Sequence, residues 1–396
     1  MDIKKCCICG NRVESKFQIA FEDLLGAKEN IYCQKIGLCK HCGYIFTQNP
    51  FTKEQLGNRY KNVSKFEYDS KDYVLDNDYK ERSIRQKHFL MENIDFSSIH
   101  SLFEVGAASG YNLSLYKSYG IQIIGVEPSS VNCRNAKSIY DIQLFNGMFD
   151  EYYTKQQGNQ KFDIVFLSMV LEHIVDPFTF ILQCKNICNN YIFIEVPTLD
   201  LRHSEEPMGI FAEEHVSLFT LDSLNSLMVK AGFRLINAEN AYGFNQYIPA
   251  AYPSIVTLWQ KSDIQSMSMR YNIFSSEELL EKYIIESFKG LKVVRDKIDA
   301  IPSHIRLAVW GVGHHASMLL ANTNLKEKNI VRVYDSDKRK SGLSFAGIEI
   351  TVFSEIDLQA NRIEAILLTT YTAQKAILKY IKNQVVNCPV ITLYDL

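Results

Sequence analysis

The sequence predicts an α/β protein with two doubly wound, mostly parallel sheets behind a small cysteine-rich module. A cluster of cysteines near the N-terminus is the first observation behind this prediction. The second is that two later segments each run through an apolar strand, a glycine-containing turn, a helix and a further strand. With 396 residues, the chain is longer than one ordinary core accommodates. We expect three parts, at residues 1–62, 63–250 and 251–396.

The composition is that of a globular, nearly neutral protein. It is 46% hydrophobic and 22% charged with a net charge of −2, which argues against a nucleic-acid partner. The polar, cysteine-rich start does not resemble a signal peptide, and we find no apolar run of the roughly 18 residues needed to span a bilayer. We therefore expect no membrane partner. Ten cysteines in such a chain predict reduced thiols, possibly with metal, rather than disulfides, and from this we expect a cytoplasmic location. The oligomeric state stays open, and a monomer is compatible with the sequence.

Two Cys-x-x-Cys pairs stand close together near the N-terminus. They are Cys6 with Cys9 and Cys39 with Cys42, and a glycine follows each pair. Two such turns complete a tetrahedral zinc site. Four protein ligands leave no open position on the ion, so the site would be structural. Its expected role is to hold together roughly 60 residues that lack a core of their own. Buried or redox-active thiols are the alternative. The neighbours that could replace a ligand are Cys7, Cys33 and His41.

The segment from Phe51 to Ile99 is polar, rich in tyrosine and helical in rhythm. We expect a lid or a bridge between modules, and a solvated connector is the alternative. Its recurring tyrosines are Tyr60, Tyr68, Tyr73 and Tyr79.

From Ser101 onward the pattern becomes strand, turn, helix and strand. Gly106 and Gly110 keep the turn small, so that a ligand can approach the backbone at the start of a helix. The next strand, residues 122–126, ends in Glu127. In a doubly wound sheet, an acid at that place lies in the crevice beside the first turn and can accept both hydroxyls of a ribose. Glu127 is therefore the leading ligand residue.

The following segments complete the pattern of this sheet. The residues Gly147-Met148-Phe149 would lie beside an adenine. Residues 161–177, KFDIVFLSMVLEHIVDP, and 189–197, NNYIFIEVP, each read as a strand followed by a short polar or proline-containing loop. A lone glycine-rich turn also occurs in NAD-binding folds. The assignment of this domain therefore depends on the order of all its segments.

Taken together, EVGAASG, VEP and FDIVFLSMVLEHIVDP resemble motifs of class I S-adenosylmethionine-dependent methyltransferases. With the cysteine pairs, EEHVSLFT at residues 213–220 and the C-terminal α/β half, the whole chain resembles the sugar C-methyltransferases that act on nucleotide-linked keto-deoxysugars. The resemblance implies a class I methyltransferase sheet of Rossmann type, a zinc-binding module and a second Rossmann-like domain. It also implies S-adenosyl-L-methionine as cofactor, structural Zn²⁺ and a nucleotide-linked sugar as substrate.

The resemblance assigns residues to the cofactor. Those after the first strand would bound its methionine end, Glu127 would hold the ribose, and two later groups would flank the adenine and the sulfonium. An NAD-binding or empty Rossmann unit is the alternative. The expected cofactor residues are Glu104, Gly106, Ala107, Gly110, Glu127, Pro128, Gly147, Met148, Phe149, Leu167, Ser168 and Met169.

Methylation of a carbon next to a ketone requires a base. His215 is the leading candidate, because imidazole titrates near neutral pH and Glu214 beside it could raise its basicity. The resembled family usually reads Tyr-His-Glu-His here, whereas this chain has Ala212 and Glu213 in place of the tyrosine and the first histidine. The sugar, its keto position or the acceptor atom can therefore differ. A capping or core histidine is the alternative for His215.

His173 follows the strand that would line the methyl-transfer crevice. It could orient the substrate or stabilise an enolate oxygen. We expect Glu172 beside it to face solvent or to cap a helix.

The C-terminal half begins with a helical rhythm from Tyr252 to Ile301 that we expect to link domains. A strand, the turn Gly311-x-Gly313-x-x-Ala316, a helix and a strand ending at Asp335 follow. This is a formal dinucleotide fingerprint. The remaining chain is short and lacks an evident hydride-transfer site, and the resemblance implies a domain that helps to enclose the nucleotide sugar.

Three hypotheses follow from the sequence. The first is a carbon methyltransferase for a nucleotide-linked keto-deoxysugar. The second is an oxygen or nitrogen methyltransferase on a related sugar or glycan precursor. The third is an NAD-binding oxidoreductase, or a noncatalytic scaffold, that uses both Rossmann units.

Overall fold

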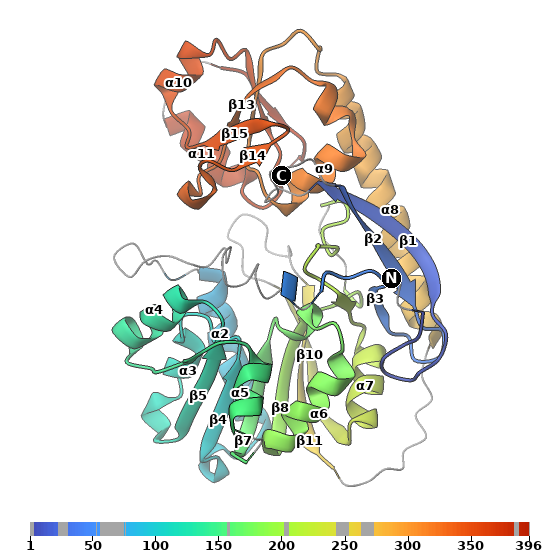
Figure 1. Cartoon of the computed structure of the whole chain (residues 1–396), viewed down its shortest axis with the longest axis vertical. Coiled ribbons are helices and arrows are strands. Elements are labelled where there is room, and N and C mark those ends of the chain that lie inside the picture. Colours follow the sequence, from blue (N-terminus) through green and yellow to red (C-terminus); the bar gives the residue numbers. More distant parts are fainter. Residues whose placement is uncertain are drawn as a thin grey trace.

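The computed structural model describes residues 4–22, 31–52, 54–55, 75, 77–156, 159–201, 206–242, 253–262, 273–383 and 388–395. The described chain forms three sheets of four, seven and six strands. In Figure 1 the seven-stranded sheet occupies the lower body and the six-stranded sheet the upper one. A long hairpin and the helix α8 run beside both bodies.

The seven-stranded sheet has the order β10-β11-β8-β7-β4-β5-β6. From β8 to β6 every pair of neighbours is parallel, whereas β11 is antiparallel to both β8 and β10. Its strands are β4 (Ser101–Val105), β5 (Gln122–Glu127), β6 (Phe145–Asn146), β7 (Phe162–Ser168), β8 (Cys188–Pro197), β10 (Phe233–Tyr242) and β11 (Pro253–Lys261).

Helices cover both faces of this sheet, because its strands are apolar on both sides. Alternate residues of β4 show this: Leu102 joins a core with Leu90 of α2, whereas Phe103 joins another core with Phe180 of α6. The helices and short 3₁₀ turns are α2 (Asn77–Asn93), η1 (Phe96–Ser98), α3 (Tyr111–Ser114), η2 (Lys117–Tyr119), α4 (Ser130–Tyr140), α5 (Phe149–Gln156), η3 (Leu171–His173), α6 (Pro177–Ile187) and α7 (Leu221–Lys230). The predicted doubly wound fold is therefore confirmed.

The expectation of a helical rhythm from Tyr252 onward is wrong for its first part. Residues 253–261 form β11, which lies between β8 and β10, beyond the expected domain boundary at residue 250. Residues 253–259 are all buried, so the strand lacks the alternation of polar and apolar residues that would have revealed it. The rest of the expectation holds, because α8 spans Ile273–Asp299.

The N-terminal part contributes β1 (Glu14–Glu22), β2 (Ile31–Leu38) and β3 (Ile45–Thr47) to the four-stranded sheet. The fourth strand comes from far along the chain: β9 (Ser217–Leu218) pairs with β3, joining Ile45 to Leu218 and Phe46 to Ser217. The cysteine-rich part is therefore joined by backbone hydrogen bonds to the segment that follows His215.

The six-stranded sheet has the order β14-β15-β13-β12-β16-β17, and all neighbours except β14 and β15 are parallel. It confirms a second Rossmann-like domain. Its elements are β12 (Leu307–Trp310), α9 (His314–Asn322), η4 (Asn324–Glu327), β13 (Ile330–Tyr334), η5 (Lys338–Lys340), β14 (Ser344–Phe345), β15 (Ile348–Thr351), α10 (Glu355–Ala360), β16 (Ala365–Leu368), α11 (Gln374–Asn383) and β17 (Val390–Thr392).

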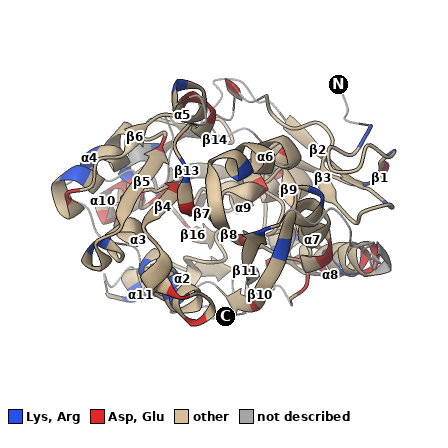
Figure 2. Ribbon diagram, turned by 90° about the horizontal axis from the view of Figure 1, so that it is seen from below, with Lys and Arg blue, Asp and Glu red and all other residues tan. Residues whose placement is uncertain are grey.

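Basic and acidic residues are scattered over the helices seen in Figure 2 and do not gather on one element. Among the helices that the structure describes, none is long and apolar enough to cross a membrane.

Candidate functional site

The turn after β4 has the conformation that its glycines permit. Gly106, Ala108 and Gly110 all have positive φ values, of 69°, 45° and 81°. The backbone N–H groups of Gly106 and Ala107 both donate to the carbonyl of Val126, at 2.9 and 3.1 Å. A side chain at Gly106 would place its Cβ 3.0 Å from a methyl group of Val170. The turn is therefore compact, and it lies against the end of β5.

Glu127 ends β5 beside this turn and is 6% exposed. Its Oε2 accepts from the N–H of Ala108, and its Oε1 accepts from the N–H of Ser129, both at 2.9 Å. The carboxylate thus joins the loops that follow the first two strands. Because each carboxylate oxygen has two lone pairs, these bonds leave acceptor capacity for hydroxyl groups of a ligand.

Glu104 is a second buried acid, 2% exposed, near the end of β4. Its Oε1 accepts from the Asn112 amide at 2.8 Å, whereas Oε2 has no hydrogen-bond partner in the described part of the chain. Burial raises the pKa of Glu104 to about 8, and the charge of Glu127 adds to this effect. An unpaired buried oxygen of this kind suits a cationic group of a ligand, such as the ammonium of a methionine moiety.

The remaining predicted cofactor residues lie along the same edge of the sheet. Gly147 donates its N–H to the carbonyl of Glu127 at 3.0 Å, and a Cβ there would collide with an oxygen of Glu151. The ring of Phe149 faces the core, with its centroid 5.1 Å from that of Phe180, and Leu167 is fully buried. Phe149 and Leu167 therefore have only backbone atoms to offer a ligand. Met148 and Met169 are half-buried, and Pro128 accepts from the side-chain amide of Asn146.

Two residues of α2 belong to this region but were not predicted as site residues, although Tyr79 is one of the recurring tyrosines noted in the sequence. Gln86 donates to Ser168 Oγ at 2.7 Å and to Glu195 Oε2 at 2.6 Å. The hydroxyl of Tyr79 lies 3.4 Å from the carbonyl oxygen of Ala107, in the glycine turn. Because α2 falls within a segment with no motif, only its amphipathic helical rhythm could have suggested them. Tyr60, Tyr68 and Tyr73 lie outside the described residues.

His173 and His215 are brought together from two segments, with ring centroids 5.0 Å apart. His173 Nδ1 lies 3.0 Å from the carbonyl oxygen of Glu214, and His215 Nδ1 lies 3.2 Å from that of Ile210. Because a carbonyl oxygen only accepts, each Nδ1 carries the proton, and we infer that each Nε2 keeps a lone pair in the neutral ring. This arrangement could accept a proton or bind a metal ion.

The expectation that Glu172 faces solvent or caps a helix is wrong. Its side chain is only 3% exposed, its Oε1 lies 3.7 Å from His173 Nε2, and its Oε2 has no hydrogen-bond partner among the described residues. The 210–216 segment crosses this loop, because the N–H of Val216 donates to the carbonyl of Glu172 at 2.9 Å. Burial raises the pKa of Glu172, and the neighbouring His173 opposes the shift.

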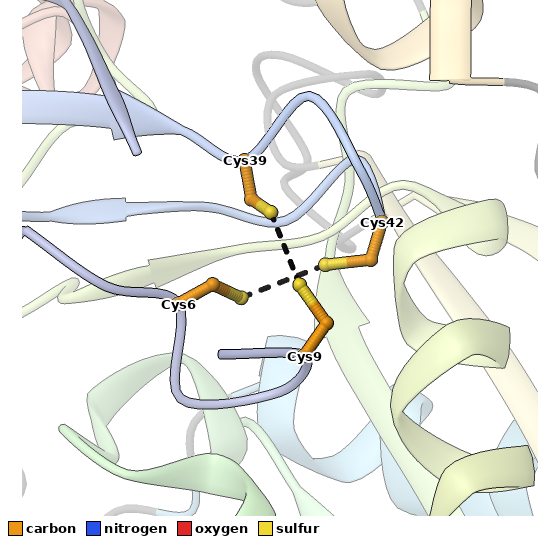
Figure 3. A group of neighbouring side chains, drawn as sticks. All are labelled: Cys6, Cys9, Cys39 and Cys42. Atoms are coloured by element: carbon orange, nitrogen blue, oxygen red, sulfur yellow. Dashed lines mark hydrogen bonds between the residues drawn. The ribbon is translucent and has the colours of Figure 1, made fainter. Parts of the chain in front are cut away.

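The four predicted cysteine ligands form one cluster (Figure 3). The sulfur atoms of Cys6 and Cys42 are 3.5 Å apart, those of Cys9 and Cys39 are 3.3 Å apart, and all four lie within 4.8 Å of one another. Tetrahedral zinc, with bonds of about 2.3 Å, requires sulfur separations of about 3.8 Å. The cluster therefore fits a zinc ion without rearrangement of the backbone. Cys7, Cys33 and His41 are not part of it.

Each pair of cysteines is held by a short turn. Gly10 donates its N–H to the carbonyl of Cys6 at 2.8 Å, and Gly43 donates to that of Cys39 at 2.9 Å. Both glycines have positive φ values, of 78° and 71°, which favour glycine at the end of such a turn. A hydrogen bond with Cys42 holds the pKa of Cys39 well below that of an ordinary thiol.

The predicted acid of the C-terminal domain is engaged by its own chain. Asp335 Oδ2 accepts from the N–H of Val312 at 2.9 Å and from Lys340 Nζ at 2.8 Å, while Oδ1 accepts from the N–H of Asp337 at 2.8 Å. At the start of α9, His314 Nε2 lies 2.7 Å from the carbonyl oxygen of Phe211. The helix end that receives phosphate in a dinucleotide fold therefore contacts the 206–211 segment here.

Three features of this sheet define the class I methyltransferase fold. The sheet is parallel except for the reversed strand β11, a compact turn follows β4, and the acid Glu127 ends β5. The comparison with protein families agrees with this class. Residues 76–238 match the family model described as a methyltransferase domain. The chain therefore contains an S-adenosylmethionine-dependent methyltransferase domain.

Curated relatives and solved structures show more distant similarity. The chain is 27% identical over 120 residues to ubiquinone biosynthesis O-methyltransferase of Rhodopseudomonas palustris strain TIE-1, matching 29% of this chain and 46% of the relative. It thus spans about half the length of that protein. A SAM-dependent methyltransferase from Archaeoglobus fulgidus is 15% identical, with a TM-score of 0.37, over 46% of this chain and 94% of the other. Magnesium protoporphyrin IX methyltransferase of Synechocystis PCC 6803 is 12% identical, with a TM-score of 0.40, over 53% and 100%.

The cysteine cluster generates a first prediction. Elemental analysis of the purified wild-type protein should find about one zinc ion per chain. Cys39→Ser should lose the ion and unfold at a lower temperature, because three ligands bind zinc far more weakly than four. Cys33→Ser, which changes an exposed thiol outside the cluster, is the control and should keep both zinc and stability. Full zinc content in Cys39→Ser would contradict the assignment.

The shifted pKa of Glu104 generates a second prediction. The pKa of Glu104 rises from its ordinary value of 4.5 to about 8 in the folded protein. At a pH between these two values, the Glu104 carboxyl holds its proton more tightly in the folded protein than in the unfolded chain. The ligand-free protein should therefore lose stability as the pH rises through this window. Glu104→Gln keeps the shape but stays neutral, so its melting temperature should fall less over the same pH range. Equal losses, measured by circular dichroism, would show that Glu104 ionises normally.

Proposed function

We propose that this protein transfers the methyl group of S-adenosyl-L-methionine to a carbon atom of a nucleotide-linked keto-deoxysugar. The observation that carries the proposal is the imidazole of His215, whose ring centroid lies 5.0 Å from that of His173, in the turn after the strand β7. The three-part layout of cysteine cluster, methyltransferase sheet and second Rossmann-like sheet supports it as well.

The cofactor supplies an electrophilic methyl group, and the protein positions it. In this proposal Glu127 and Pro128 bind the ribose, and the unpaired oxygen of Glu104 receives the ammonium group of the methionine moiety. The turn at Gly106, Ala107 and Gly110 lies along that moiety. The segments 147–149 and 167–169 flank the adenine and the sulfonium, with Phe149 and Leu167 contributing backbone atoms only.

Proton removal is the step that the histidines would serve. A proton on a carbon next to a carbonyl becomes acidic enough to remove when the enolate oxygen is stabilised. In the proposed mechanism His215 Nε2 receives this proton, Glu214 beside it favours the charged imidazole, and His173 stabilises the enolate oxygen. The resulting carbanion then attacks the methyl group in line with its bond to sulfur.

Methylation of an oxygen atom is a second candidate, because two observations favour it. Ala212 and Glu213, both buried, stand where the resembled family has a tyrosine and a histidine, so the tyrosine that would help to hold a ketone is replaced. The curated relatives are also named as O-methyltransferases. A hydroxyl of a related sugar would then lose its proton to His215, and the same imidazole would serve both reactions.

The surrounding parts have supporting roles in the proposal. Residues 1–62 bind zinc, residues 63–250 carry out methyl transfer, and residues 251–396, apart from β11, help to enclose the sugar nucleotide. The engagement of Asp335 by Lys340 supports this role over NAD binding. A cytoplasmic location and the absence of a nucleic-acid partner remain predictions from the composition.

The ribose assignment can be tested by calorimetry. Glu127→Ala should weaken binding of S-adenosylhomocysteine by roughly 1 to 3 kcal/mol, since buried hydroxyl groups lose their acceptor. Glu92→Ala, on the exposed face of α2, is the matched control and should bind as the wild type does. Unchanged affinity in Glu127→Ala would remove the assignment.

The acceptor and the base can be tested together. Incubation with S-adenosylmethionine and a keto-deoxysugar nucleotide in deuterated water should give a methylated sugar and exchange of the proton next to the carbonyl. His215→Gln should slow both by roughly a hundredfold or more while S-adenosylhomocysteine binding stays intact. His304→Gln, at an exposed site in the C-terminal half, is the control.

Mass spectrometry would locate the new methyl group in the same reaction. A methyl group on oxygen, without proton exchange, would decide for the second candidate. If no keto-sugar nucleotide gives either proton exchange or a methylated product, the first candidate, carbon methylation, is excluded.

A further inference from the structure

The residues Glu172, His173 and His215 form a second group of possible metal ligands, separate from the cysteine cluster. One carboxylate oxygen and one ring nitrogen from each histidine all lie within 4.8 Å of one another. Two of these residues belong to η3, which follows β7, and the third comes from the loop before β9. The group therefore lies beside the crevice proposed for methyl transfer.

Both imidazoles are oriented as metal ligands usually are. A metal-binding histidine donates its second ring N–H to a carbonyl or a carboxylate, which fixes the tautomer and leaves a lone pair for the ion. Here the carbonyls of Glu214 and Ile210 lie against the two Nδ1 atoms. In this tautomer Nε2 is the nitrogen that carries the lone pair in each ring, and His173 Nε2 lies 3.7 Å from Oε1 of Glu172.

The carboxylate of Glu172 supplies independent support. It is buried, and its Oε2 has no hydrogen-bond partner in the part of the chain that the structure describes. The 3.7 Å between Oε1 and His173 Nε2 is too long for a hydrogen bond. Arg82, the cation that also influences this carboxyl, is paired with Asp78 at 2.8 Å. A buried carboxylate whose hydrogen bonds are not satisfied destabilises the folded protein unless a cation compensates its charge.

We propose that Glu172, His173 and His215 bind one divalent transition-metal ion and leave its remaining positions open to an oxygen of the methyl acceptor. Two imidazoles and one carboxylate with open positions suit iron, manganese, cobalt or zinc. Ligand bonds of about 2.1 Å require donor atoms within about 4.2 Å of one another. Small side-chain rotations toward a common centre satisfy this requirement.

The proposal deepens the proposed function and rests on it for the identity of the acceptor. An ion bound to His215 Nε2 occupies the lone pair that would otherwise receive the proton. In the ion-bound protein His215 is therefore a ligand and not the base. A bound ion would instead polarise the keto or hydroxyl oxygen of the acceptor, so that the acidified proton could pass to a water molecule and the methyl group could then be transferred.

Cobalt is the probe, because it binds imidazole and carboxylate and its spectrum reports thiolate ligands. The full chain, with zinc retained in the cysteine cluster, should bind about one Co²⁺ and show ligand-field bands without thiolate-to-cobalt charge transfer. Glu172→Gln and His173→Gln should each weaken this binding by more than about tenfold. His88→Gln, an exposed histidine of α2, is the matched control and should bind as the wild type does.

The outcomes separate this proposal from the proposed function. No cobalt binding beyond the zinc content, charge-transfer bands from thiolates alone, or equal affinity in Glu172→Gln would overturn the metal site. Binding of S-adenosylhomocysteine in the same samples tests the methyltransferase assignment independently. Unchanged zinc content and melting temperature in the variants would show that any loss of cobalt is local and does not reflect unfolding.

Discussion

The arrangement of the candidate active site depends on hydrogen bonds between the N-terminal sheet and the segment around His215. The Gln34 amide donates to the carbonyls of Ala212 and His215, each at 3.0 Å, and the N–H of Thr47 donates to the carbonyl of Val216 at 2.8 Å. Gln34 is fully buried, so these bonds are protected from water. The cysteine cluster links the segment before β1 to the turn between β2 and β3 of this sheet, so a bound zinc ion would indirectly restrain the loop that carries His215.

Two buried acids at the edge of the methyltransferase sheet differ in how their carboxyl groups are hydrogen-bonded. Glu127 has its charge compensated by backbone N–H groups from the loops that it joins, so it organises the crevice before any ligand arrives. Among the described residues, Glu104 has only the Asn112 amide as hydrogen-bond partner, and its Oε2 has none. Such an unpaired group lowers the stability of the free protein and favours a ligand with a complementary charge. The edge of the sheet is thus partly preorganised and partly dependent on its ligand.

The C-terminal domain is packed against the others through both ends of α9. The ring of His314 lies 4.5 Å from that of Phe21 in β1, and the Asn322 amide donates to the carbonyl of Ala20 at 2.7 Å. Residues of both domains and of β1 share one apolar core. A helix terminus that is free to bind phosphate in a dinucleotide-binding domain is used here for contacts within the chain.

The sequence by itself determined the order of most elements, the turn at Gly106, the place of Glu127 and the grouping of four cysteines. Each depends on residues close together in the chain, where spacing and backbone geometry act directly. The strand β11 was missed because it is buried on both faces, and Glu172 was misjudged because the segment that buries it lies some forty residues further along. The pairing of His173 with His215 and of β3 with β9 likewise joins distant residues. Only the tertiary structure decided these features, because burial and side-chain contact depend on which segments meet in space, and no local pattern encodes that.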